Sequence, residues 1–289
     1  MNSIYLHTDD LGITKSSTET ILKSWKDGVL ESFSLIANGD AIQLATSEIN
    51  RNADLKARIA LHFNLTEGMP ISDPNKIPYL VNKDGYFSCS FSKLLFKTLI
   101  ANKLSLSNQI RLELTNQFNY LQAQCPKRKI EIIDGHNHIQ MIPFIFLVVA
   151  RTAKELGVNE IRISDEPLYV SNLKKDLLSN YFYLNLVKNL TLKLFSLYAR
   201  RVSKNYGLIS VDAIIGLLYS GHMTSERVMS ALSLRKFQAK KRIEVIFHIG
   251  RSRPEESIRW ANASYSDFHL SRNRDIENDE LVALKKVLK

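Results

Sequence analysis

An acid and two imidazoles stand close together in residues 134–138, which read Asp-Gly-His-Asn-His. The preceding residues, 129–133, are apolar and rich in β-branched side chains, and they predict a short buried strand. The residues from Pro143 to Gly157 predict a helix that ends at the glycine. Imidazole suits zinc, copper, iron or nickel, and carboxylate suits magnesium or manganese. The pattern therefore allows several divalent metals, although a polar turn with surface histidines would have the same sequence.

Acids, imidazoles or a guanidinium also stand on or after other predicted strands. They are Asp9 and Asp10 after the first strand, His62 after the third, Asp134, His136 and His138 after the central one, Arg162 on the next and His248 after the last. In an α/β barrel the active site is built at the carboxyl ends of several strands, so we expect these side chains to share one site. Each also has an ordinary explanation, since paired acids cap helices, single histidines lie in cores and arginines make surface ion pairs.

These residue types suit a hydrolytic reaction. One carboxylate and two neutral imidazoles can hold a divalent ion that keeps open coordination positions. Such an ion lowers the pKa of bound water and polarises a carbonyl group. A second carboxylate beside the first could accept the proton of water, and a histidine across the site could protonate a leaving amine. The set therefore predicts metal-assisted hydrolysis of an amide or ester.

The elements that must position these residues alternate between strand and helix. Strands are expected over 3–8, 29–37, 58–61, 129–133, 159–164, 209–215 and 243–247, and helices after Ser16 (with a capping box to Glu19), from 41, near 105–123, from 143, after Thr224 or Ser225 and from 278. A long proline-containing loop over 67–92 is expected to be functional. The alternation favours an α/β fold with a parallel sheet, and about seven strands favour a barrel over a doubly wound open sheet.

Composition places further limits on the protein. With 289 residues, 45% hydrophobic and 24% charged, the chain is typical of a globular protein with a full core. Two cysteines, Cys89 and Cys125, form no disulfide framework and fit a reducing compartment. We find no signal peptide and no apolar stretch long enough to span a membrane, so a cytoplasmic location is expected. The net charge of +10 favours an anionic partner, and the lack of a nucleic-acid motif makes nucleic acid the weakest choice.

A basic and apolar insert is predicted over 173–206. Its seven basic residues against one acid supply a net six of the ten positive charges; they are Lys174, Lys175, Lys188, Lys193, Arg200, Arg201 and Lys204 against Asp176. Outer barrel helices with solvated lysines would explain this composition. A basic amphipathic helix that faces an anionic membrane or a lipid-linked sugar would explain it as well.

Four motifs carry a family resemblance. Residues 8–12 (Thr-Asp-Asp-Leu-Gly), 61–66 (Leu-His-Phe-Asn-Leu-Thr), 134–138 and 247–250 (Phe-His-Ile-Gly) resemble, in order and spacing, the YdjC-like carbohydrate deacetylase family over most of the chain. The resemblance implies a distorted (β/α) barrel of about seven parallel strands, the NodB-like deacetylase barrel. It also implies removal of acetyl groups from N-acetylated sugars with one divalent metal ion, magnesium or zinc.

The same resemblance assigns roles to residues. Asp10, His62 and His136 would hold the metal, Asp9 would be the base and His248 the acid, although the two aspartates could exchange roles.

The expected substrate contacts are His138, Asn64, Arg162 and Asp134, with His138 either beside the ligands or facing the substrate. Gln140 stands where the family often has a further histidine, and Ile249 stands where a proline is usual. Both differences weaken any transfer of substrate identity.

We therefore predict one domain over 1–289, with the insert at 173–206, that deacetylates a mono- or oligosaccharide or a lipid- or nucleotide-linked glycan. A sugar-binding or scaffold member of the same barrel family without activity is the main alternative. A phosphate-ester hydrolase is a second alternative, but Arg162 and Arg251 are the main cations that the expected site offers to a phosphate. A lipid-linked substrate or membrane contact through the insert, a peripheral place at the inner membrane face and a homodimer are left open.

Overall fold

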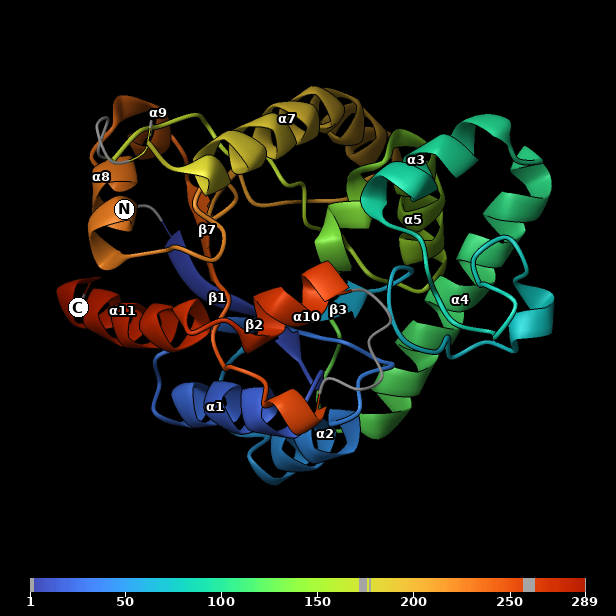
Figure 1. Ribbon diagram of the computed structural model, residues 1–289, viewed down its shortest axis with the longest axis horizontal. Coiled ribbons are helices and arrows are strands. Elements are labelled where there is room, and N and C mark those ends of the chain that lie inside the picture. Colours follow the sequence, from blue (N-terminus) through green and yellow to red (C-terminus); the bar gives the residue numbers. More distant parts are fainter. Residues whose placement is uncertain (1–2, 172–175, 177, 257–262, 289) are drawn as a thin grey trace.

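The computed structural model describes residues 3–171, 176, 178–256 and 263–288. Seven parallel strands form one sheet in the order β5-β4-β3-β2-β1-β7-β6, surrounded by helices (Figure 1). The strands are β1 Ser3–Leu11, β2 Ser32–Leu35, β3 Arg58–Phe63, β4 Ile132–Gly135, β5 Glu160–Ile161, β6 Ala213–Ile215 and β7 Arg242–Phe247. Apart from the first three residues of β1, almost every strand residue is buried, as expected for a parallel sheet covered by helices.

The two edges of the sheet meet through a few backbone hydrogen bonds. Ile161 N–H donates to the carbonyl of Ile209 at 3.0 Å, and Ile209 N–H donates to Asn159 at 2.8 Å. Further along, Ile214 N–H donates to Asp165 at 3.1 Å. These bonds close the sheet between β5 and β6 and confirm the distorted barrel in place of the open sheet.

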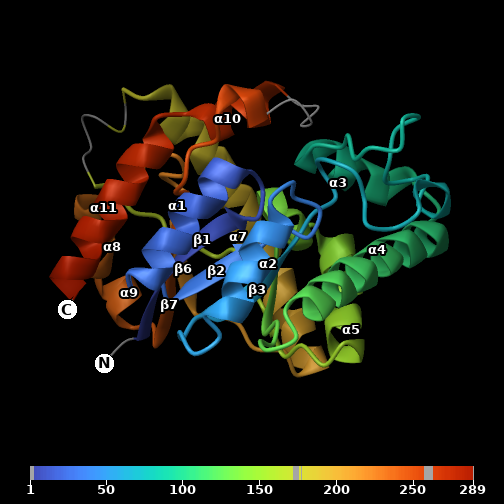
Figure 2. The ribbon, with the colours of Figure 1, turned by 90° about the horizontal axis from the view of Figure 1, so that it is seen from below.

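The α-helices follow the strands as returns and as additions at the barrel ends. They are α1 Lys15–Lys26, α2 Ile42–Arg51, α3 Phe91–Ile100, α4 Lys103–Gln124, α5 Pro143–Glu155, α7 Asn180–Tyr206, α8 Ser225–Leu232, α9 Arg235–Gln238, α10 Ala263–Leu270 and α11 Asn273–Leu288, with short 3₁₀ turns η1 Pro74–Lys76, η2 His136–Met141 and η3 Pro254–Glu256. Figure 2 shows α10 and α3 on the same side of the molecule, away from both chain ends.

Two helix starts can be compared with the capping residues that the sequence predicts. Thr224 caps α8, as predicted, because its side chain accepts from Arg227 N–H. The predicted capping box at Ser16 is wrong, since α1 begins at Lys15 and the N–H of Ser16 donates instead to Glu256 Oε1 at 2.9 Å. A contact from a distant part of the chain replaces the local cap.

The predicted insert is only partly described. Lys174 and Lys175 lie outside the described residues, whereas 180–206 form the single long helix α7. Among the described residues no helix has both the length and the apolar character needed to cross a bilayer.

Candidate active site

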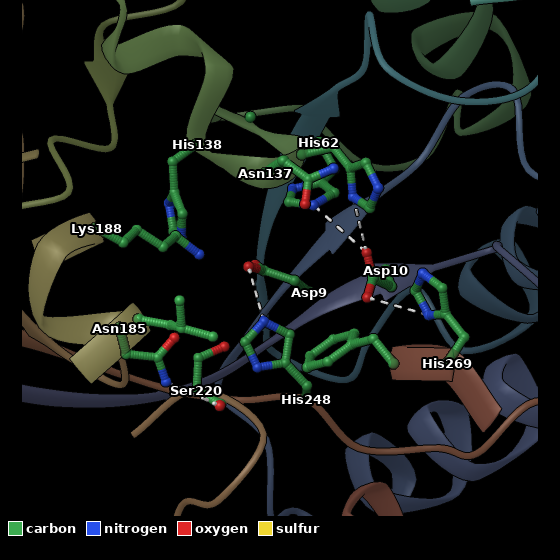
Figure 3. A pocket seen from close by; sticks show the side chains of 14 residues that line it. Asp9, Asp10, His62, Asn137, His138, Asn185, Lys188, Ser220, His248 and His269 are labelled. Carbon is green, nitrogen blue, oxygen red and sulfur yellow. Dashed lines mark hydrogen bonds and ion pairs between the residues drawn. The ribbon is translucent and has the colours of Figure 1, made fainter. Parts of the chain in front are cut away.

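A bulge in β1 presents two neighbouring acids to the same cavity. Side chains of a regular strand alternate between its faces, so Asp9 and Asp10 would point in opposite directions. The pairing of β1 with β2 shifts between Thr8 and Leu11, and Asp10 has a left-handed φ of 67°. Both carboxylates therefore line one pocket at the carboxyl end of the barrel (Figure 3).

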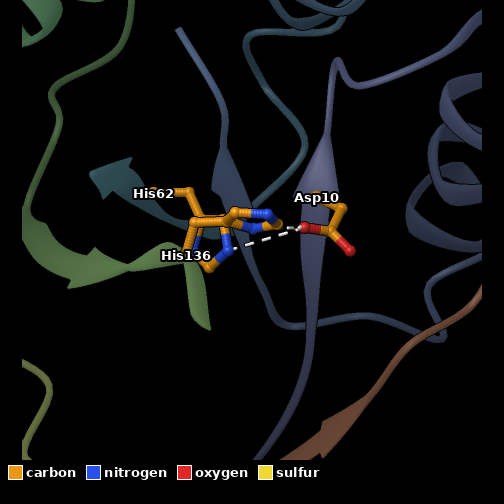
Figure 4. A group of neighbouring side chains, drawn as sticks. All are labelled: Asp10, His62 and His136. Atoms are coloured by element: carbon orange, nitrogen blue, oxygen red, sulfur yellow. Dashed lines mark ion pairs between the residues drawn. The ribbon is translucent and has the colours of Figure 1, made fainter. Parts of the chain in front are cut away.

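Asp10, His62 and His136 converge as predicted for a metal site. Asp10 Oδ1 lies 3.5 Å from His62 Nε2 and 3.2 Å from His136 Nδ1 (Figure 4). Two donors on a tetrahedral ion with bonds of about 2.1 Å would stand about 3.4 Å apart. All three side chains are buried and come from three different strand ends. The donor types and their spacing fit one divalent ion.

A carboxylate behind His62 fixes its ring. Asp134 Oδ1 accepts a hydrogen bond from His62 Nδ1 at 2.7 Å, and a carboxylate can only accept, so Nδ1 carries the proton. Nε2 is then left to face Asp10, the arrangement that makes imidazole a stronger metal ligand. Burial lowers the pKa of His62, but the charges of Asp134 and Asp9 raise it to about 10. The pocket of carboxylates therefore attracts a cation at this point.

His136 is flanked by two carboxylates as well. Its Nε2 lies 3.5 Å from Glu67 Oε2, while Nδ1 faces Asp10. Burial lowers the pKa of His136, and Glu67 together with Asp10 raises it to about 9. The next two residues, Asn137 and His138, both adopt left-handed backbone angles, which is uncommon for non-glycine residues and typical of functional turns.

Two C-terminal residues complete the surroundings of Asp10 and were not predicted. Arg274 of α11 donates from Nη2 to Asp10 Oδ2 at 3.2 Å, which leaves Oδ1 toward the histidines. His269 of α10 lies 3.9 Å from the same Oδ2 and lines the pocket. Burial raises the pKa of Asp10, and the nearby imidazoles of His136 and His62 lower it well below the usual range.

Asp9 is held through one oxygen and open through the other. Its Oδ1 accepts from Arg162 Nη1 at 2.8 Å and lies 2.9 Å from His7 Nε2. Its Oδ2 lies 4.0 Å from His248 Nε2 across the pocket. Burial raises the pKa of Asp9, but Arg162, His62 and His7 lower it well below the usual range, so this carboxylate is ionised and can accept a proton.

Three of the four residues expected to contact substrate lie behind the pocket wall. Arg162 is buried against three carboxylates, with contacts of 2.8 Å to Asp9, 2.9 Å to Asp134 and 2.6 Å to Glu244. Asp134 is fully buried by its contacts with His62 and Arg162. Asn64 is also buried, and its side-chain oxygen accepts from the backbone of residues 66 and 67. These residues position others, whereas His138 does line the pocket.

The pocket has a volume of about 470 Å³. Its lining side chains come from several strand ends and from α7 and α10; they are Asp9, Asp10, His62, His136, Asn137, His138, Leu184, Asn185, Lys188, Ser220, His248, Phe268 and His269 (Figure 3). Small-ligand sites commonly span about 300–1,000 Å³. The residues of α7 and α10 carry no local sequence motif, so only the tertiary fold reveals them.

Comparison with known proteins identifies relatives. A family model described as YdjC-like protein matches residues 3–284. A carbohydrate deacetylase of Danio rerio is 29% identical over 166 residues, which cover 55% of this chain and 49% of the relative. A chitooligosaccharide deacetylase of Escherichia fergusonii is 30% identical over 166 residues, covering 57% and 61%. The match thus spans about half to three fifths of these two relatives.

A solved structure has the same fold. The chain superposes on a proposed cellobiose-phosphate cleavage protein of Enterococcus faecalis V583 with a TM-score of 0.66 and 17% identity, covering 100% of this chain and 99% of that one. At this identity the likeness concerns the barrel alone. The family model covers nearly the whole chain, and the chain therefore belongs to the YdjC-like protein family.

Proposed function

We propose that this protein is a metal-dependent hydrolase that removes the acetyl group from an N-acetylated sugar. The observation that carries the proposal is the convergence of Asp10, His62 and His136, with donor spacings of 3.2 and 3.5 Å, beside a second carboxylate in one pocket. The names of the curated relatives support the substrate class.

Asp10, His62 and His136 would hold the ion, which we expect to be zinc or magnesium. A divalent ion at these donors would polarise the acetyl carbonyl and lower the pKa of a water molecule. Asp134 and Glu67 hold the two imidazoles from behind, so the protein fixes the donors before the ion arrives.

Asp9 supplies the base in this proposal. Its Oδ2 faces the pocket, while Arg162 and His7 hold Oδ1. As the oxygen of water forms its bond to the acetyl carbon, Oδ2 takes the proton that water loses. Arg162 keeps the carboxylate ionised until that moment.

His248 supplies the acid for the leaving nitrogen. Burial lowers the pKa of His248 to about 4, so this imidazole is neutral at pH 7 in the free protein. It must therefore gain a proton before it can give one away. Asp9 Oδ2, at 4.0 Å from Nε2, is the nearest source once it has taken a proton from water. Cleavage of the carbon–nitrogen bond then releases acetate and the amine.

Metal analysis combined with an acetate-release assay tests this function. We expect the purified protein to bind about one ion and to release acetate from at least one of a panel of N-acetylated sugars. Chelation should abolish turnover, and added zinc or magnesium should restore it. His62→Ala should lose both ion and activity.

Asp9→Asn and His248→Ala should retain the ion and slow turnover by about 10²–10⁴, the usual contribution of general acid–base catalysis. Near-normal turnover of His248→Ala would remove the acid assignment. Loss of the ion in Asp9→Asn would mean that the two aspartates exchange roles. A protein that releases acetate from no sugar would instead be the inactive sugar-binding member of the family.

Cys89 and Cys125 are buried free thiols, which fits a reducing compartment, and we propose a cytoplasmic enzyme on that ground. Cell fractionation tests the location. The homodimer and the peripheral place at the inner membrane face stay predictions.

A further inference from the structure

Helix α7 exposes several large apolar side chains as well as basic ones. Leu184, Val187, Leu194 and Leu197 are 65–74% exposed, and their spacings of three and seven residues place them on one side of the helix. An apolar stripe on the outer face of a barrel helix is unusual, because such helices normally bury their apolar side. Something other than packing within the described chain must account for it.

Two basic side chains of α7 form ion pairs with a carboxylate of the barrel, whereas Arg201 and Lys204 are exposed. Lys193 Nζ lies 2.6 Å from Asp165 Oδ1, and Arg200 Nη2 lies 2.7 Å from Asp165 Oδ2. Both therefore share one carboxylate, whose single negative charge balances one of the two. The predicted contact of the basic insert with anionic lipid stays a prediction.

An apolar groove runs between α3 and α7 and adjoins the active-site pocket. It has a volume of about 480 Å³, and its apolar lining comes from Phe91, Leu95, Leu184, Val187 and Leu192. Three residues, Asn137, Leu184 and Lys188, line both the groove and the pocket. The groove and the pocket therefore lie side by side.

Lys188 stands at this junction. Figure 3 shows its side chain reaching into the pocket beside His138 and Asn185. Within the described chain no carboxylate lies at ion-pair distance from Lys188, unlike Lys193 and Arg200 on the same helix. A half-buried ammonium without a partner favours an anionic group in the ligand.

Resting on the deacetylase function above, we propose that the substrate is an amphiphile whose N-acetylated sugar is joined through an anionic group, such as a phosphate, to a hydrocarbon chain. The sugar occupies the pocket, the anionic group lies beside Lys188, and the chain lies in the groove between α3 and α7. The adjacency of groove and pocket, with Lys188 lining both, favours this occupant over a membrane surface or a second copy of the chain.

Chain preference tests the groove. Octyl and methyl β-glycosides of N-acetylglucosamine are compared by kcat/KM below the micellar concentration of the octyl compound. Each buried methylene should improve the ratio about fourfold, so two or three methylenes in the groove give about a 15- to 60-fold preference for the octyl compound. Calorimetric titration of metal-free protein with both glycosides measures the same preference without turnover.

Val187→Asp and Leu194→Asp form a matched pair of variants. Both side chains are 65% exposed on α7, but only Val187 lines the groove. We expect Val187→Asp to reduce the octyl-to-methyl ratio to near one and Leu194→Asp to preserve it. Equal values for octyl and methyl compounds in the unmodified protein would overturn the groove assignment and leave the deacetylase function standing. Loss of the octyl preference in both variants would assign the apolar face of α7 to a membrane surface. A change in the sedimentation coefficient of the protein in either variant would assign it to a second copy of the chain.

Lys188→Met tests the anionic group. The unmodified protein should prefer an octyl phosphodiester of N-acetylglucosamine over the neutral octyl glycoside, with a preference that falls as salt rises. Lys188→Met should reduce the phosphodiester-to-glycoside ratio about 10-fold or more, as expected for loss of a charge-assisted contact. A preference that survives in Lys188→Met would remove the anionic group from the proposal. If no sugar of any kind releases acetate, the deacetylase function itself fails, and with it this inference.

Discussion

Replacing Asp134 by asparagine should weaken divalent metal binding through His62. The substitution keeps an oxygen that can accept the 2.7 Å hydrogen bond from His62 Nδ1, so the ring keeps its orientation toward Asp10. It removes the negative charge that makes the imidazole a better donor, and such partners are worth about 10- to 100-fold in metal affinity. Loss of the charge also lowers the affinity of His62 for the proton that competes with the metal, because Asp134 is a main group raising the pKa of His62 to about 10. This second effect favours the metal and limits the loss. We therefore expect about a tenfold loss, or about 1.4 kcal/mol.

Glu244→Gln is the matched control. Asp134 and Glu244 both contact Arg162 Nη2, at 2.9 and 2.6 Å, so each variant leaves this buried cation with two carboxylates. Both should lower the free energy of unfolding by about 1–3 kcal/mol, the usual cost of disturbing a buried charged hydrogen bond. Only Asp134 contacts His62. Competition titration with a chromogenic zinc chelator at pH 8 should show weaker binding in Asp134→Asn alone. Equal weakening in both variants would refute the reasoning and place the effect in the charge of Arg162.

Two further predictions concern the backbone and pH. An added Cβ at Gly250, which has φ +78°, would lie 2.6 Å from the carbonyl oxygen of Ser17, whereas Gly28, with φ +70°, has nothing within 4 Å. Thermal unfolding should show a loss of about 1 kcal/mol for Gly28→Ala from the left-handed backbone alone and about 2–4 kcal/mol for Gly250→Ala, and equal losses would contradict the predicted steric contact. Burial lowers the pKa of Lys188 to about 8, against the opposing charges of Asp9 and Glu166, so its ammonium is present below pH 8 and lost above it. The preference for a phosphodiester over a neutral glycoside should therefore fall between pH 7 and 9, and a flat ratio over this range would contradict the role of Lys188.

The sequence predicted the ends of the central strands well because their polar motifs directly follow buried runs. His62, His136 and His248 stand at the ends of β3, β4 and β7, where the barrel rule placed them. Arg162 also lies at a strand end, as predicted. The sequence did not show that its side chain is buried among three carboxylates, because these come from strands far apart in the chain.

The remainder of the site depends on contacts without a local signal. His269 and Arg274 reach Asp10 from helices near the C-terminus, more than 250 residues away in sequence. Two basic residues of the insert, Lys193 and Arg200, pair with Asp165 of the barrel, a contact that no local pattern predicts. Composition shows how many charges a helix has, whereas the direction of each charge is fixed by its partner.

The bulge in β1 has a consequence for transplanting this chemistry into other barrels. The shift between Thr8 and Leu11, with the left-handed Asp10, sets the separation between Asp9 and Asp10 through the backbone. An idealised strand that carried the same two letters would turn one carboxylate outward. A designer who grafts this active site must therefore copy the irregular backbone first, and a homology search by side-chain pattern in regular strands would overlook such sites.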